Sequence, residues 1–167
     1  GNTFFSIQRH GVFKLDDEQP GDSKFFGAAD GSLEPTFDGA STNYVLPGQM
    51  SLDSEDNVWV TTKFVREGGG VISIFSPDDS IYHIYQYQGG LESRSVKSIA
   101  IDDNDMVWLG SQVRTELQAG GGIDFLEIVG GSLHNDMEIN VSHLTTDSPL
   151  ASNEILQLEV DTHNTLW

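Results

Sequence analysis

The sequence predicts an all-β protein built from four-stranded β-propeller blades, and three observations lead to this fold class. One turn pattern recurs, because the heptapeptides DSEDNVW, DDNDMVW and DTHNTLW end at Trp59, Trp108 and Trp167. The tryptophans are 49 and then 59 residues apart, a spacing too long for one hairpin and suitable for one four-stranded blade. No stretch longer than about ten residues has a clean helical period.

Each blade is expected to contain four strands, which we name A to D in chain order. Strand A precedes the Asp-rich turn, and its apolar residues alternate, which is typical of a strand with one buried face. These alternating positions are Met50 and Leu52, Ile99 and Ile101, and Leu156, Leu158 and Val160. Strand B runs through the tryptophan, and strand C follows a glycine cluster, as in GGGVISIF and GGGIDFLEI. The runs IYHIYQY and MEINVSHL supply strand D, and GNTFFSIQRHGVFKL matches strands B and C.

The turn between strands A and B has a defined residue pattern. Its first position is Asp, whose side-chain oxygens can accept hydrogen bonds from nearby backbone N–H groups. Its fourth position is Asp or Asn, residues that tolerate a left-handed backbone. The first positions are Asp53, Asp102 and Asp161, and the fourth are Asp56, Asp105 and Asn164. We expect each Trp to fill the wedge between successive blades, with its indole N–H bonded to a backbone acceptor.

This combination of strand, D-x-x-[DN]-x-aliphatic-W turn and Gly-Gly-aliphatic segment resembles the two-component regulator propeller repeat. The residues that carry the resemblance are SLDSEDNVWVTT with GGGV, SIAIDDNDMVWLGS with GGGI, and LEVDTHNTLW. The family usually has Gly at the fourth turn position, where this chain has Asp or Asn. The Asp-box of sialidase-like propellers, S-x-D-x-G-x-x-W, is the rival, but SLDSEDNVW is one residue too long for it and lacks its glycine.

The repeats predict that residues 1–167 are a propeller fragment of two full blades flanked by two halves. Gly11 and Val12 correspond to Gly70 and Val71, which places the Trp position of the N-terminal unit just before Gly1. Closed propellers need at least about four blades. We therefore expect the remaining blades to come from a longer chain, or from homo-oligomerisation as the alternative.

Charge and composition narrow the choice of partners. With 26 acidic and 8 basic residues the net charge is -18, so the surface should repel nucleic acid and anionic lipid. The chain has no cysteine, which excludes a disulfide framework and thiol chemistry. No apolar run approaches the roughly 18 residues that span a membrane, and no basic-then-apolar leader precedes the repeats.

The residue patterns predict no catalytic residue, metal site or cofactor. The acidic turns begin like calcium loops but lack the loop glycine and the distal bidentate Glu, so a structural turn is the favoured interpretation and calcium stays open. The five histidines have no zinc-ligand spacing, and no nucleophile elbow is present. The glycine clusters lack the Lys-Ser/Thr of a phosphate loop. A carboxylate pair for glycoside cleavage stays possible among 26 acidic residues.

The arginines have an uneven predicted distribution. In a propeller the B–C and D–A connections open on one face, and the A–B and C–D connections open on the other. All four arginines fall in the first group, as Arg9, Arg66, Arg94 and Arg114, whereas the second group is rich in Asp and Glu. Solvated loops often carry charge, but guanidinium groups at one mouth would also suit a carboxylate or sulfate.

Two function classes follow from these observations. The resemblance implies a non-enzymatic sensing or scaffolding module of an extracytoplasmic protein, periplasmic or secreted, with a protein or an anionic glycan as its partner. The alternatives are a propeller-fold glycoside hydrolase or polysaccharide lyase, and a surface structural protein. The predicted ligand-binding residues are the four arginines.

Overall fold

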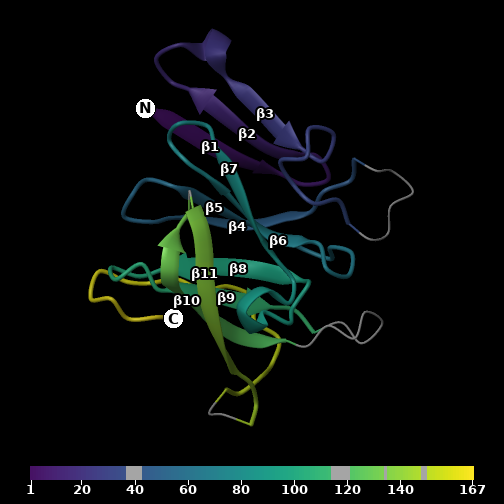
Figure 1. Ribbon diagram of the computed structural model, residues 1–167, viewed down its shortest axis with the longest axis vertical. Helices are drawn as coiled ribbons and strands as arrows, with labels where there is room; N and C mark the ends of the chain where they lie inside the picture. The colour runs from purple at the N-terminus through teal and green to yellow at the C-terminus, as the bar shows by residue number, and fades with distance from the viewer. Residues whose placement is uncertain (37–42, 114–120, 134, 148–149) are drawn as a thin grey trace.

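The computed structural model describes residues 1–36, 43–113, 121–133, 135–147 and 150–167. These residues form three antiparallel sheets with the strand orders β1-β2-β3, β4-β5-β6-β7 and β8-β9-β10-β11. Figure 1 shows the sheets stacked in chain order, from the purple N-terminal sheet at the top to the green sheet at the bottom. The prediction of an all-β fold made of four-stranded blades is confirmed.

The strands have the following bounds. The N-terminal sheet contains β1 (Asn2–Ile7), β2 (Gly11–Asp16) and β3 (Lys24–Gly27). The middle sheet contains β4 (Pro47–Leu52), β5 (Val58–Thr62), β6 (Gly70–Phe75) and β7 (Ile81–Tyr85). The third contains β8 (Val96–Ile101), β9 (Val107–Ser111), β10 (Gly122–Ser132) and β11 (Asn135–Leu144). The helical elements of the described residues are two 3-10 turns, η1 (Pro20–Asp22) and η2 (Gln88–Gly90). The described residues contain no helix that is long and apolar enough to cross a membrane.

The middle and third sheets are the two complete blades, with β4 and β8 as their A strands. The N-terminal sheet supplies strands B, C and D alone. Residues 155–160 repeat the A pattern, and the turn that follows them closes through an antiparallel bridge between Val160 and Leu166. The described residues thus contain a three-stranded sheet, two four-stranded sheets and one further A-type segment with its turn.

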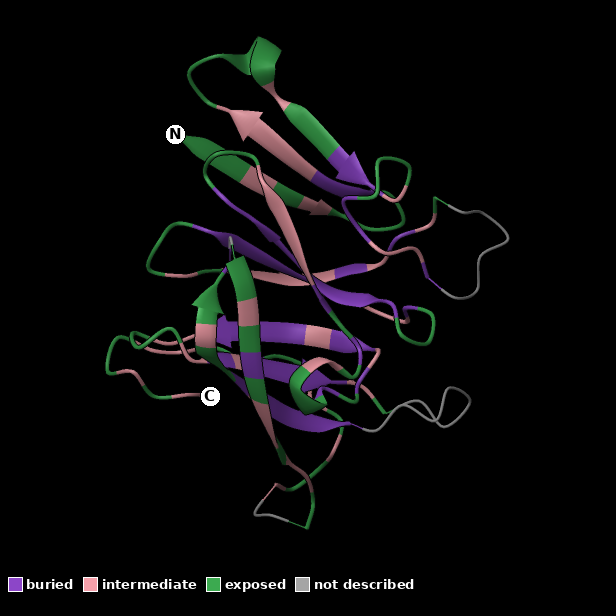
Figure 2. Cartoon of the chain, viewed as in Figure 1, coloured by how far each residue is buried: buried purple, intermediate pink, exposed green. Residues whose placement is uncertain are grey.

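The core consists of apolar layers between successive blades. Trp59 of the middle sheet is buried against Ile99, Val107 and Leu109 of the third sheet. Trp108 packs in the same way on Leu158 of the following A strand. Each blade thus buries an apolar face on the next blade, and the central strands β5 and β6 of the middle sheet are buried along their whole length (Figure 2).

The N-terminal sheet differs from the sequence-based expectation in one respect. Phe4 pairs with Lys14, three residues beyond Gly11, just as Trp108 pairs with Phe125, three residues beyond Gly122. The Phe4 ring also packs 6.3 Å from Phe75, in the layer that contains Met50 and Val58. The aromatic position is therefore Phe4, and the expectation that it precedes Gly1 is wrong. The error arose because β1 and β2 join through a tight turn that is shorter than the other B–C loops.

Candidate functional site

The first Asp of each turn organises the whole turn through its carboxylate. Asp53 Oδ1 accepts the backbone N–H groups of Glu55 at 3.0 Å and Asn57 at 2.9 Å, and Oδ2 accepts the indole N–H of Trp59 at 2.8 Å. The acceptor of the indole N–H is thus this carboxylate. The expectation of a backbone acceptor is wrong. Asp102 repeats the pattern with Asn104, Met106 and Trp108, and Asp161 repeats it with His163, Thr165 and Trp167.

The fourth turn residue links one turn to the next. Asp105 accepts the backbone N–H of Ser54 at 2.9 Å and its hydroxyl at 2.5 Å. Asn164 accepts the backbone N–H of Asp103 at 2.8 Å. Both acceptors have left-handed backbone, with φ of 57° and 60°. At these two positions the side chain therefore combines a left-handed conformation with a hydrogen-bond acceptor, which a glycine would not provide.

These hydrogen bonds give the acidic residues of the turns a structural role. The carboxylate oxygens of the first Asp residues already accept N–H groups of the protein. Among the described residues no group of three His, Cys, Asp or Glu side chains is arranged to hold a metal ion. The turns thus have a role in the fold without any ligand.

The predicted arginines lie in loops at the opposite ends of the blades. Arg9 is in the β1–β2 turn with φ of 73°, Arg66 is in the β5–β6 loop, and Arg94 precedes β8. The Val65 N–H donates to the Arg94 carbonyl at 3.0 Å, so the Arg66 and Arg94 loops are adjacent. Arg114 lies outside the described residues. We call the surface formed by Arg9, Lys63, Arg66, Arg94 and Lys97 the basic loop face.

Arg66 has an acidic partner that the sequence did not suggest. Its Nε lies 2.6 Å from Glu34 Oε1, where Glu34 comes from the segment after β3. The Arg66 side chain is 71% exposed and the Glu34 side chain is 13% exposed. This contact joins the first blade to the second, so part of the role of Arg66 is structural.

Lys63 and Lys97 were not among the predicted ligand-binding residues. The Lys63 N–H donates to the Leu46 carbonyl at 2.9 Å, and a Cβ on the nearby Gly48 would lie 2.6 Å from the Lys97 carbonyl oxygen. Both lysines therefore flank the first residues of β4. Burial lowers the pKa of Lys63, and the positive charge of Lys97 lowers it further. Neither lysine forms an ion pair within the described part of the chain.

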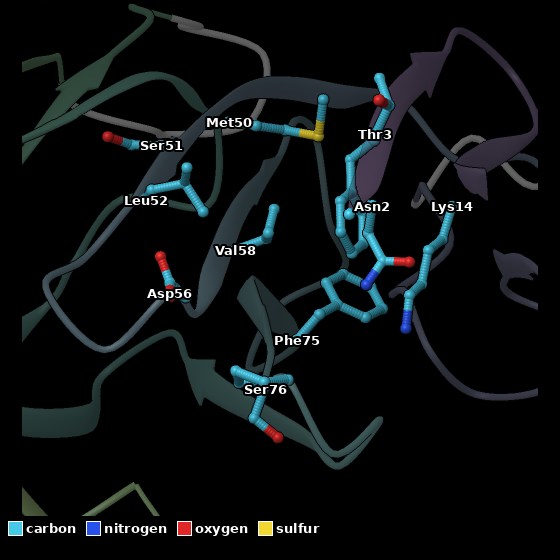
Figure 3. A pocket seen from close by; sticks show the side chains of 13 residues that line it. Asn2, Thr3, Lys14, Met50, Ser51, Leu52, Asp56, Val58, Phe75 and Ser76 are labelled. Atoms are coloured by element: carbon cyan, nitrogen blue, oxygen red, sulfur yellow. The ribbon is translucent and has the colours of Figure 1, made fainter. Parts of the chain in front are cut away.

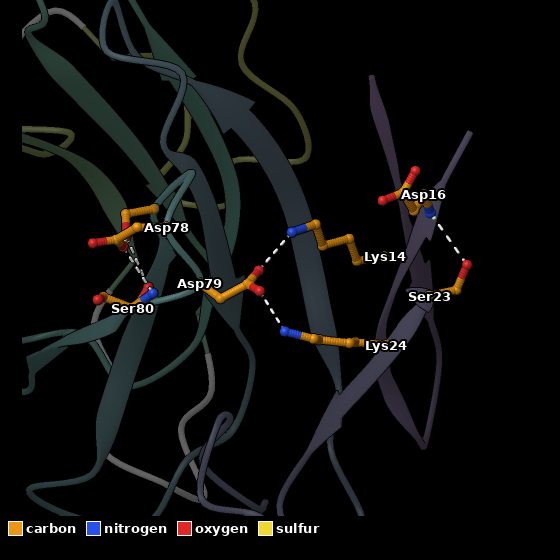
Figure 4. Close-up of polar contacts among 8 residues, drawn as sticks. Lys14, Asp16, Ser23, Lys24, Asp78, Asp79 and Ser80 are labelled. Atoms are coloured by element: carbon orange, nitrogen blue, oxygen red, sulfur yellow. Dashed lines mark hydrogen bonds and ion pairs between the residues drawn. The ribbon is translucent and has the colours of Figure 1, made fainter. Parts of the chain in front are cut away.

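The other two lysines share one acidic partner. Lys14 of β2 lies 2.5 Å from Asp79 Oδ1, and Lys24 of β3 contacts Asp79 Oδ2 (Figure 4). Asp79 belongs to the β6–β7 turn, and hydrogen bonds from both ammonium groups lower its pKa. These lysines join two blades on the Asp-turn side, whereas Lys63 and Lys97 on the loop side have no such counter-charge in the part of the chain that the structure describes.

Buried hydroxyl groups collect at the same end of the blades as the basic loop face. Thr62 and Ser111 are the last residues of β5 and β9, and Ser95 directly precedes β8. All three are completely buried. Their hydroxyl oxygens have no hydrogen-bond partner among the residues that the structure describes.

A buried carboxylate orients a histidine at this end of the third blade. Asp124 of β10 is 2% exposed, and its Oδ1 lies 2.5 Å from His143 Nδ1 of β11. Burial raises the pKa of Asp124, while the hydrogen bond from His143 lowers it. The middle blade has a neutral counterpart, in which Ser73 Oγ lies 3.1 Å from His83 Nδ1. Both pairs join strand C to strand D.

No protein-family model matches the chain, and no curated protein matches it either. Several solved structures are similar to the chain. The extracellular domain of the putative hybrid two component system BT4673 from B. thetaiotaomicron has a TM-score of 0.59 and 16% identity, covering 100% of this chain and 18% of that one. PorZ, a surface component of the type-IX secretion system of Porphyromonas gingivalis, has a TM-score of 0.60 and 18% identity, covering 100% and 23%. A putative gluconolactonase has a TM-score of 0.59 and 11% identity, covering 99% and 52%.

These similarities concern the fold. The chain folds as part of a propeller and spans between about a fifth and about a half of the structures that it matches. At such low identity the matches do not transfer a ligand or an activity to this chain.

Proposed function

We propose that this chain is part of a sensing or scaffolding propeller module outside the cytoplasm, and that its basic loop face binds an anionic ligand such as an acidic glycan. The fold supports the first part. Two of the similar structures are described as an extracellular domain of a two-component system and as a bacterial surface component. The resemblance of the repeats to the two-component regulator propeller points in the same direction.

One contrast carries the proposal for the ligand. The lysines on the Asp-turn side each form an ion pair with Asp79, whereas Lys63 and Lys97 have no acidic partner within the described residues. A half-buried ammonium group without a counter-charge raises the free energy of the folded protein unless a bound anion compensates its charge.

The net charge of -18 does not exclude such a ligand. Interactions between exposed charges are largely screened beyond the Debye length, about 8 Å at physiological salt. Most carboxylates of the chain lie on the Asp-turn side, while the anion would contact the ammonium groups directly. Guanidinium groups of Arg9 and Arg94 at the rim would favour planar carboxylate or sulfate groups.

The test compares two charge-matched double variants, Lys63→Gln with Lys97→Gln, and Lys14→Gln with Lys24→Gln. Binding of a polygalacturonate oligosaccharide, a heparin oligosaccharide and neutral maltohexaose is measured by calorimetry, well below each melting temperature. We expect the loop-face variant to weaken binding of a charged glycan by roughly tenfold or more, because two charge-assisted contacts are lost. The Asp-turn variant should bind nearly as the parent chain. Equal binding by both variants, or equal binding of maltohexaose, would contradict the proposal.

Cleavage of the same glycan is a second candidate function, favoured by the Asp124–His143 pair. A buried carboxylate that holds Nδ1 leaves the other imidazole nitrogen available as an acid or base. The His143 side chain is 43% exposed. The test incubates polygalacturonate with the chain and with the His143→Gln variant. Product formation that the variant lacks would support catalysis, and no product from either would exclude it for this substrate.

A further inference from the structure

Two tyrosine rings are exposed beside the arginines of the basic loop face. Tyr85 is the last residue of β7 and pairs with Gly70, the first residue of β6, so it lies at the loop end of the middle blade. Tyr87 follows in the connection that leads to Arg94 and β8. The two tyrosines are 46% and 58% exposed. They present apolar ring surface that a ligand can cover.

Another exposed apolar surface is a groove of about 700 Å³ between the N-terminal sheet and the middle sheet (Figure 3). Leu52 and Phe75 line it together with the charged side chains of Asp56 and Lys14. Lys14 is already bound to Asp79. An anionic ligand is therefore better matched to the tyrosines on the loop side, where the arginines lie.

Tyr85 lies beside the ion pair between Arg66 and Glu34. A Cβ on Gly70 would lie 3.7 Å from Tyr85 Cε1 and 3.8 Å from Glu34 Cβ. It would also lie 3.9 Å from His83 Cβ, and the His83 and Tyr85 ring centroids are 6.0 Å apart. Arg66 contacts Glu34 at 2.6 Å through Nε and is 71% exposed. The ring of Tyr85 thus has an accessible guanidinium group in its surroundings.

Tyr87 has a backbone conformation that fixes the position of its ring. Its φ of 74° lies in the left-handed region, which bulky residues rarely adopt. The Tyr87 N–H donates to the Leu91 carbonyl at 2.6 Å, and the hydroxyl donates to Glu67 Oε1 at 3.1 Å. The hydrogen bond to Glu67 raises the pKa of Tyr87, whereas the nearby charge of Arg94 lowers it. Tyr87 is therefore a neutral phenol near a guanidinium group at physiological pH.

Gln86 lies between the two tyrosines and joins the loops that carry them. It is 8% exposed. Its Oε1 accepts the Gly68 N–H at 2.9 Å, and its Nε2 donates to the Glu92 carbonyl at 2.7 Å. Its backbone N–H donates to the Gly69 carbonyl at 3.0 Å. These bonds connect the β5–β6 loop to the loop before β8, and a surface fixed in this way loses little conformational entropy when a ligand binds.

We propose that Tyr85 and Tyr87 stack on the pyranose rings of an acidic glycan, whose carboxylate groups are held by Arg66 and Arg94. This inference rests on the function proposed above and assigns the recognition of the sugar ring to one part of the basic loop face. The face of an aromatic ring is electrostatically negative, so it attracts the polarised C–H groups on one side of a pyranose. Arg66 keeps further N–H donors besides the one that Glu34 accepts, and guanidinium groups bind carboxylates in bidentate geometry.

The test compares the polygalacturonate oligosaccharide with polyglutamate, a polyanion that has no sugar rings, by calorimetry. The double variant Tyr85→Leu with Tyr87→Leu keeps apolar side chains and removes both rings. We expect it to weaken binding of the oligosaccharide at least ~5-fold and to leave polyglutamate binding unchanged. Tyr85→Phe with Tyr87→Phe should bind the oligosaccharide as the parent chain does. Phe25→Leu removes a ring that is 49% exposed in the N-terminal sheet, and this control should also bind as the parent does.

Two further measurements accompany the comparison. The C–H protons of the bound oligosaccharide should shift upfield in NMR spectra with the parent and the Phe variant, because ring currents act on them, and should not shift with the Leu variant. Tyr87→Asn, which suits the left-handed backbone, should weaken oligosaccharide binding at least ~2-fold. The melting temperature of each variant confirms that it is folded.

The outcomes separate this inference from the proposed function. If both the Leu variant and Tyr87→Asn bind the oligosaccharide as the parent does, while Lys63→Gln with Lys97→Gln binds it weakly, the stacking role is wrong and the anion site stands. Equal losses for the oligosaccharide and polyglutamate would also overturn the stacking role, because the effect would not depend on sugar rings. If the parent chain binds neither the polygalacturonate nor the heparin oligosaccharide, the proposed function fails and this inference fails with it.

Discussion

Replacing Asp53 by Ala should destabilise the protein far more than the same change at Asp161, although the two turns have nearly the same sequence. Asp53 Oδ2 accepts the indole N–H of Trp59 at 2.8 Å and the side-chain N–H of Asn57 at 2.8 Å. Trp59 and Asn57 are each 1% exposed. Both donors are buried, so removal of the carboxylate leaves them without a partner in the protein. At Asp161 the indole partner is Trp167, which is 74% exposed, so water replaces the lost acceptor.

The magnitude follows from the number of buried donors left without a partner. Each costs about 1–3 kcal/mol, so Asp53→Ala should lose roughly 2–6 kcal/mol of unfolding free energy. Asp102→Ala should lose an intermediate amount, because its bond to the half-buried Trp108 is 3.3 Å long. Asp161→Ala should stay within experimental error of the parent. Asp53→Asn should fall between Asp53→Ala and the parent, because its one carbonyl oxygen can still accept the backbone N–H groups.

Urea unfolding followed by tryptophan fluorescence and by circular dichroism measures these differences, with equal m-values as the check on two-state behaviour. The reasoning is refuted if Asp53→Ala and Asp161→Ala cost the same. That result would mean that the carboxylate acts only on the local turn, and that burial of its indole partner has no influence on stability.

Three further predictions concern contacts between blades. Gly48→Ala should lower the melting temperature strongly, because the new Cβ would lie 2.2 Å from Thr61 Oγ1 and 2.6 Å from the Lys97 carbonyl oxygen. Gly21→Ala is the control and should leave the melting temperature unchanged, because no atom lies within 4 Å of its new Cβ. Asp79→Asn should lower the melting temperature more at low salt than at 1 M salt, where the Debye length falls to about 3 Å; an equal loss at both would contradict a role for the Lys14 and Lys24 ion pairs. Burial lowers the pKa of His83 below its unfolded value of about 6.5, so the unfolded chain binds the proton more readily. The contribution of His83 to the unfolding free energy should therefore be complete above that value and should decline as the pH falls through the folded-state pKa. His83→Gln should flatten this decline in melting temperature between pH 7.5 and 5, and an unchanged slope would refute it.

The local architecture of this protein can be predicted from its residues alone. Alternation of apolar residues defines a strand within a few positions, and Asp53, Asp102 and Asp161 each precede a left-handed Asp or Asn by three residues. These signals depend on backbone geometry and neighbouring side chains, so they predicted the strands, the turns and the four-stranded blade. The aromatic position of the N-terminal sheet was misplaced because counting from Gly11 depends on loop length, whereas strand pairing selected Phe4.

The contacts between blades depend instead on how the folded sheets pack on one another. This packing buried Trp59 between the middle and third sheets, and it paired Arg66 with Glu34. It also placed Lys63 and Lys97 beside the start of β4 without a counter-charge among the described residues. No local pattern encodes these contacts, because the partners lie in different repeats and come together only when one sheet packs on the next.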